Sequence, residues 1–305
     1  MIENRGEAER IWWNKFSDIM AMQWEMTPYL NKVLRKSMID DFSTFLYKEN
    51  GKVLDLGCGN GWISRIFADL NMDVVGVDFS KEQIDFSKEM ISKNLNYCNK
   101  INFVCDNITN LDSNIIGKNF DSVIISALLH HLTSDEMKQV FIGLEKVMVP
   151  NGRIYLYEPI IFDTYKNKFK YYKFSYMFFV KLKDYLFRIM GKLNMISHKF
   201  VEAQKNGYTG ISPHEAPFTY STLAECLNKY FTIKEVRPLH GFNIGWGTFQ
   251  MAVKPIPGYF LKICTPLVNA LDRKLLSMKQ WPRISNHIWL LSGIKIEYNE
   301  KYNKK

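Results

Sequence analysis

The chain contains few cysteines, and none of them forms a closely spaced pair. Five cysteines are spread over 305 residues, and no two stand in a Cys-x-x-Cys arrangement. Zinc sites and small disulfide frameworks need such pairs, so the spacing disfavours both. The same scarcity is typical of a reducing compartment, and we expect a cytoplasmic protein.

Long apolar runs are also absent. No window of about 18 residues is both apolar and free of charge, so we expect no membrane-spanning helix. The first ten residues, MIENRGEAER, are polar and charged, which predicts that they are not a secretory signal. Two phosphate-binding signatures are missing as well. The sequence has no Gly-Lys-Ser/Thr run, and Trp62 stands where a dinucleotide fingerprint needs its third glycine.

What the sequence does contain is an apolar stretch that runs into alternating glycines. Residues 53–61 read VLDLGCGNG, with glycine at 57, 59 and 61, and the helical pattern WISRIFADL follows. Such a continuous apolar run predicts a buried parallel strand. A strand, a glycine-rich turn and a helix let backbone N–H groups approach a ligand closely.

Two acidic residues suggest which ligand this is. A second apolar run, residues 74–77, ends at Asp78, about 20 residues beyond the first glycine. A carboxylate at that distance is suited to bonding the hydroxyls of a ribose. Asp55 precedes the first glycine and would repel a pyrophosphate, but it suits a ligand with a positive end. The unit therefore predicts a nucleoside site.

The run D-L-G-C-G-N-G, residues 55–61, resembles motif I of class I S-adenosylmethionine-dependent methyltransferases, with a small-molecule, type 11-like domain. This resemblance implies S-adenosylmethionine as cofactor and S-adenosylhomocysteine as product. It implies that Asp78 holds the ribose, that Asp106 accepts from the adenine amino group, and that Asp55 and Ser126 serve the amino acid end. The residues expected at the cofactor are Asp55, Gly57, Cys58, Gly59, Asn60, Gly61, Asp78, Phe79, Asp106, Asn107, Ile108 and Ser126.

The pattern of the chain predicts an α/β fold. Helical segments are expected to alternate with the first five strands, as in βαβ units. Strands are expected at 52–56, 73–78, 101–105, 120–126, 152–158, 231–237 and 247–254, and helices at 62–70, 80–96, 133–148 and 219–229. The result is a doubly wound, Rossmann-like, seven-stranded sheet, mostly parallel with the last strand antiparallel.

Five segments are expected along the chain. They are a helical N-terminal cap (1–50), the cofactor-binding core (51–159), a basic aromatic helical insertion (160–213), the end of the core (214–255) and a helical C-terminal appendage (256–305). Charge separates them, because residues 1–163 hold 17 Lys and Arg against 23 Asp and Glu. Residues 164–205 hold 10 basic residues against 2 acidic ones, and residues 256–305 hold 9 basic residues against 3 acidic ones. Acidic core and basic accessory segments should therefore have different partners.

Two adjacent histidines are the candidates for catalysis. His130 and His131 follow the fourth expected strand, and ligands of open α/β sheets lie at the carboxyl ends of strands. With an ordinary pKa near 6.5, histidine can act as the general base for an oxygen acceptor. We expect His130 to be the base, with His131 second. The alternative is that the pair only packs, or caps the helix that begins near Thr133.

Three further residues are candidates for substrate binding: Glu158, His214 and His240. No metal is expected, because Ser126 stands where the catechol-type enzymes carry an acidic metal ligand. Nucleic acid is not an expected acceptor, since the run Ser-Ala-Leu-Leu from Ser126 replaces the Asp/Asn-Pro-Pro-aromatic motif of nucleic-acid amino methylases.

These observations predict a metal-independent methyltransferase that acts, mainly at oxygen, on a small-molecule acceptor or one linked to a lipid or sugar. An anionic acceptor would suit the basic insertion, which could form a substrate lid or a peripheral membrane contact. The alternative is a methyltransferase-like binding module that docks on membrane or RNA through that insertion. The acceptor, the choice of oxygen over nitrogen or carbon, and the oligomeric state stay open.

Overall fold

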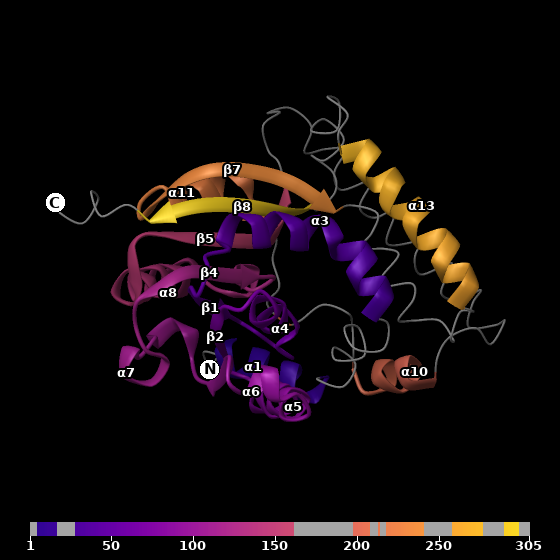
Figure 1. The fold of residues 1–305 in the computed structure, drawn as a ribbon, viewed down its shortest axis with the longest axis horizontal. Coiled ribbons are helices and arrows are strands. Elements are labelled where there is room, and N and C mark those ends of the chain that lie inside the picture. Colours follow the sequence, from indigo (N-terminus) through magenta and orange to yellow (C-terminus); the bar gives the residue numbers. More distant parts are fainter. Residues whose placement is uncertain are drawn as a thin grey trace.

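The strands form one mixed sheet in a computed structural model of the chain. The structure describes residues 5–16, 28–161, 198–207, 213, 218–240, 258–276 and 290–298. The strands are β1 (Lys52–Leu56), β2 (Asp73–Asp78), β3 (Ile101–Cys105), β4 (Phe120–Ser126), β5 (Met148–Ile161), β6 (Phe218–Thr219), β7 (Phe231–His240) and β8 (Leu290–Tyr298). Their order is β3-β2-β1-β4-β5-β8-β7, and the short β6 pairs with β5. Figure 1 shows the labelled strands from β2 to β7 in this order.

Helices follow most of the strands. They are α1 (Arg5–Lys15), α3 (Pro28–Leu46), α4 (Trp62–Asp69), α5 (Lys81–Ser92), α6 (Leu95–Cys98), α7 (Ser113–Ile116), α8 (Ser134–Val147), α10 (His198–Lys205), α11 (Tyr220–Leu227) and α13 (Gly258–Leu276). Two 3-10 turns, η1 (Ile108–Asn110) and η2 (Leu129–His131), follow β3 and β4. The predicted helix 80–96 is divided into α5 and α6, because Asn94 caps a new helix through Asn96 N.

Apolar side chains cover both faces of the sheet. On one face, Phe141 of α8 and Leu223 of α11 join the buried core. On the other, Phe42 of α3, Phe67 of α4 and Ile84 of α5 form a second core cluster. Burial on both faces explains why the first strands are nearly continuous apolar runs. The predicted doubly wound fold and its first five strands are confirmed, with β5 longer than expected.

The closing strand lies elsewhere than predicted. The expected strand 247–254 falls outside the described residues, and the last strand that the structure describes is β8, within the segment expected to be helical. β8 lies between β5 and β7 and is antiparallel to both. Ile294, Ile296 and Tyr298 are buried and alternate with partly exposed Lys295 and Glu297, which is a half-buried strand pattern. Residues 290–298 therefore belong to the core, and the expectation of a wholly helical 256–305 was wrong.

The accessory segments are described only in part. α1 and α3 form the expected N-terminal helices, and α3 packs on β4, β5 and β8. Most of the predicted basic insertion, residues 162–197, lies outside the described part of the chain. The helix α13 packs against α3 and β7. Among the helices that the structure describes, none has the length and apolar character needed to cross a membrane.

A buried polar contact joins α3 to the centre of the sheet. The hydroxyl of Tyr155 on β5 donates to Asp41 Oδ2 at 2.9 Å, and Lys295 Nζ on β8 lies 2.8 Å from Asp41 Oδ1. Tyr155 is fully buried. A Cβ added at Gly293 of β8 would lie 2.1 Å from the Tyr155 hydroxyl oxygen, so this contact requires glycine there.

Replacing Gly293 by alanine should therefore lower the free energy of unfolding by roughly 1–3 kcal/mol, because the added methyl group overpacks a buried site. Urea denaturation of Gly293→Ala measures this loss. The loss should be smaller in a Tyr155→Phe background, where the nearest atom has been removed. Equal losses in the two backgrounds would contradict this packing.

Candidate active site

The glycine loop after β1 is held against the end of β2. The N–H groups of Gly57 and Cys58 donate to the carbonyl of Val77 at 2.8 and 3.1 Å. A Cβ at Gly61 would lie 2.3 Å from the Phe103 ring, so packing requires this glycine. Gly59 has a φ of +52°, and its added Cβ would meet no heavy atom closer than 3.9 Å. The loop is thus open at Gly59, where a ligand can approach the backbone.

Asp78 ties this loop to the start of α5. Its Oδ2 accepts from Gly59 N and its Oδ1 from Ser80 N, both at 2.9 Å, and its side chain is buried. Burial raises the pKa of Asp78, while these backbone hydrogen bonds lower it. Each carboxylate oxygen has two lone pairs, so both retain the capacity to accept from a ribose hydroxyl.

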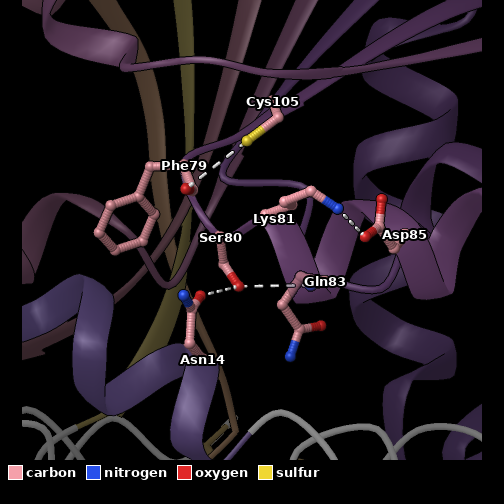
Figure 2. A network of polar contacts seen from close by, with 7 residues as sticks. All are labelled: Asn14, Phe79, Ser80, Lys81, Gln83, Asp85 and Cys105. Carbon is pink, nitrogen blue, oxygen red and sulfur yellow. Dashed lines mark hydrogen bonds and ion pairs between the residues drawn. The ribbon is translucent and has the colours of Figure 1, made fainter.

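The N-terminal helix α1 reaches the same edge of the sheet. Ser80 Oγ donates to Asn14 Oδ1 at 2.7 Å and accepts from Gln83 N at 3.3 Å (Figure 2). The thiol of Cys105 lies 3.8 Å from the carbonyl oxygen of Phe79 in the same view. One α1 side chain thus contacts the cap of α5, two residues after Asp78, so α1 lies beside the expected ribose position.

Asp55 is the second buried carboxylate under the loop. It is 1% exposed, and Ser64 Oγ donates to its Oδ2 at 2.6 Å. Burial raises the pKa of Asp55 to about 7, and the nearby charge of Asp78 adds to this, whereas the Ser64 hydrogen bond opposes it. A positive ligand group nearby would favour the ionised form of Asp55.

One amide next to the loop has an unused donor. Asn60 is 2% exposed, and its Nδ2 has no hydrogen-bond partner among the described residues, while its Oδ1 lies 3.4 Å from Trp62 N. A buried donor without a partner is costly unless a ligand accepts from it. The open Gly59, the carboxylate of Asp78 and this amide together fit a nucleoside that carries an amino acid, as S-adenosylmethionine does.

The expected adenine residues follow β3 on the neighbouring strand end. The N–H of Asp106 donates to the Asp78 carbonyl at 3.0 Å, which brings the two acidic residues together. Asp106 Oδ1 accepts from Asn107 N at 2.7 Å. Asn107 caps the 3-10 turn through Thr109 N, and Ile108 is buried. The Asn107 side-chain oxygen is therefore engaged in a turn.

A buried carboxylate organises the turn after β4. Glu158, near the end of β5, is 0% exposed, and its Oε1 accepts from the N–H groups of Leu128 and Leu129 at 3.0 and 2.8 Å. Its Oε2 lies 2.7 Å from His130 Nδ1, and the His130 side chain is 5% exposed. Ala127 begins this turn with a φ of +52°. Such left-handed backbone in a non-glycine residue costs about 1–3 kcal/mol and persists where surrounding contacts impose it.

The two histidines have different partners. The rings of His130 and His131 lie 4.0 Å apart between centroids. His131 Nδ1 lies 3.5 Å from Glu9 Oε2, and its ring meets Trp13 edge-on at 5.6 Å. Glu9 and Trp13 both belong to α1. Neither histidine caps α8, because Thr133 forms that cap.

The remaining predicted residues are placed as follows. Ser126 is half-buried at the end of β4 and pairs with Tyr157. His214 lies outside the described residues, as does the side chain of His240, whose backbone ends β7. Across the described side chains, no group of three or more His, Cys, Asp or Glu is placed to hold a metal ion.

Sequence reasoning missed several residues at this site: Ser64, Glu9, Trp13 and Asn14. The helical periodicity of α1 was visible, but it does not indicate which strand ends the helix will cover. Glu158 was expected to bind substrate, whereas the structure places it against His130 and the turn.

The raised pKa of Asp55 predicts a pH-dependent stability. Between about pH 4 and 7 the folded protein retains a proton that the unfolded chain has lost, so stability falls as pH rises through this window. Relative to Asp55→Asn, wild type should lose roughly 1–3 kcal/mol of unfolding free energy between pH 5 and 7. Urea denaturation without ligand measures this difference. Asp73→Asn, an exposed carboxylate of β2, is the control, and the same pH slope in wild type and Asp55→Asn would refute the assignment.

Parts of the chain are similar in sequence to known proteins. Residues 47–212, more than half of the chain, match a family model described as a methyltransferase domain. A ubiquinone biosynthesis O-methyltransferase from Coxiella burnetii is 28% identical over 184 residues, which cover 58% of this chain and 70% of that protein. Its counterpart from Aliivibrio fischeri is 23% identical over 224 residues, which cover 68% of this chain and 88% of that protein.

A solved structure shares the fold over most of the chain. The crystal structure of the [4+2]-cyclase SpnF aligns with a TM-score of 0.50 at 11% identity and covers 86% of this chain and 80% of that one. This likeness concerns the fold alone. The match of the family model over more than half of the chain identifies the family: the protein belongs to the methyltransferase domain family and is a class I S-adenosylmethionine-dependent methyltransferase.

Proposed function

We propose that the protein methylates a hydroxyl group of a small-molecule acceptor, with His130 as general base and Glu158 as the residue that positions it. The observation that carries this proposal is the 2.7 Å contact between His130 Nδ1 and the buried Glu158 carboxylate at the carboxyl ends of β4 and β5. Ligands of open α/β sheets bind at that edge. The two relatives are named as O-methyltransferases, which supports an oxygen acceptor.

The chemistry requires little from the protein beyond alignment and a base. S-adenosylmethionine, when bound, supplies a methyl group activated by a sulfonium. In this proposal Asp78, Asn60 and Gly59 would hold its nucleoside and amino acid parts. The acceptor hydroxyl must lose its proton, and a positioned histidine typically contributes about 10²–10⁴-fold to such a step.

The Glu158 contact assigns the two ring nitrogens of His130 different roles. Because Nδ1 faces the carboxylate, the acceptor's proton would be taken at Nε2, and Glu158 would stabilise the imidazolium that forms. No metal takes part in this proposal, since Ser126 ends β4 and the base is a histidine. A phenol is a suitable acceptor class, because its hydroxyl is acidic enough for a histidine base, and a lipid-linked phenol would fit equally well.

The cofactor assignment predicts a specific loss of affinity. Asp78→Ala should weaken S-adenosylhomocysteine binding by about 1–3 kcal/mol, because a buried carboxylate that can accept from the ribose is removed. Titration calorimetry measures this change. Asp73→Ala removes an exposed carboxylate from the same strand and should leave affinity unchanged. Undiminished binding by Asp78→Ala would exclude the ribose role.

The base assignment predicts a loss of turnover at constant cofactor affinity. His130→Ala should lower kcat by about 10²–10⁴-fold, measured as S-adenosylhomocysteine released with a panel of phenols. Glu158→Gln should lower kcat less and change its pH profile, because the amide cannot stabilise an imidazolium equally well. Small and equal losses in His130→Ala and His131→Ala would contradict this role and point to His214 or His240.

A further inference from the structure

Three aliphatic side chains of α13 are exposed, whereas two of its polar side chains are buried. Ile263, Leu267 and Leu271 are 62%, 65% and 53% exposed. Steps of four residues place them along one side of the helix, and we call them the outer stripe. On the buried side, Thr265 is 0% and Asn269 5% exposed.

At these five positions the exposure is the reverse of that on an ordinary surface helix. A helix stabilised only by packing on its own protein turns its apolar stripe inward and its polar face outward. α13 packs against α3 and β7, yet the three side chains of the outer stripe stay more than half exposed. A cluster of exposed aliphatic residues of this kind marks an interaction surface.

Charge indicates the partner. α13 holds three cations, Lys262, Arg273 and Lys274, against one acidic residue, Asp272. Lys274 is exposed and follows Leu271 by three residues, which places it on the stripe's side of the helix, and the exposed Lys262 directly precedes Ile263. Cations that flank an aliphatic face are typical of helices that lie in the headgroup region of a bilayer. We propose that α13 is a peripheral membrane-binding helix that lays its outer stripe on an anionic lipid surface.

A second copy of the chain is a poorer partner for this surface. A two-fold interface through the outer stripe would bring the same cations of both copies near one another. The chain carries a formal net charge of +9, which disfavours such self-association. Anionic lipid instead favours each added cation near the surface by roughly fivefold, about 1 kcal/mol.

The position of α13 relates this surface to the candidate active site. β5 and β7 are both antiparallel to β8, so they run in the same direction. Figure 1 shows α13 beyond the arrowhead of β7, at the side of the sheet where the parallel strands end. Membrane contact through α13 would therefore occur on the side of the molecule at which an acceptor enters. The proposal does not depend on the identity of that acceptor.

Co-sedimentation with vesicles tests the proposal on the full chain. Wild type should bind vesicles of phosphatidylcholine and phosphatidylserine at low salt and bind pure phosphatidylcholine far less. The triple variant Ile263→Ser, Leu267→Ser, Leu271→Ser should bind the mixed vesicles at least about tenfold more weakly. The matched control Leu95→Ser, Ile115→Ser, Ile142→Ser removes three exposed aliphatic residues elsewhere and should bind as wild type.

A second variant separates charge from apolar contact. Lys262→Gln, Lys274→Gln keeps the outer stripe and should lose roughly 25-fold in affinity for mixed vesicles, that is, fivefold per cation. Thermal melting confirms that each variant is folded. Wild-type binding by the folded triple variant, or no wild-type binding to either vesicle, would overturn the proposal. So would dimerisation of wild type that the triple variant abolishes, because the stripe would then be a protein interface.

Discussion

The candidate active site depends on one buried carboxylate. Glu158 is fully buried, and a buried charge is tolerated only when its oxygens are paired. One oxygen accepts from two backbone N–H groups of the turn after β4, and the other faces His130. The left-handed backbone of Ala127 begins this turn. Removal of the Glu158 side chain would therefore release both the turn and the histidine.

The features that could be predicted from the sequence depend on residues close together in the chain. The glycine loop needs the positive φ of Gly57 and the close packing at Gly61, and both requirements are visible as glycines in the sequence. The Glu158–His130 pair could not be predicted in this way, because it is created by the β4–β5 register that pairs Ser126 with Tyr157. β8 did have an alternating pattern, but Gly293 interrupts it and a helical segment precedes it, so a helical appendage was expected instead.

The two carboxylates under the glycine loop suit a ligand but destabilise the protein that has no ligand bound. Asp55 and Asp78 are both buried, and burial raises both pKa values. Burial makes the ionised forms of both carboxylates unfavourable when no ligand is bound. A ligand that carries a positive charge and donor hydroxyls would offset this cost in free energy. Destabilised groups of this kind are common at functional sites. Membership of the methyltransferase family is consistent with this explanation, because S-adenosylmethionine carries both a positive charge and ribose hydroxyls.

In the proposed mechanism Glu158 holds His130 at the edge of the sheet where the methyl group is transferred. A crystal structure with S-adenosylhomocysteine bound tests this role most directly. We expect the His130–Glu158 contact to persist and His130 Nε2 to lie within reach of a hydroxyl placed in line with the sulfur. A structure in which His131 faces the sulfur while His130 stays enclosed behind the η2 turn would contradict it.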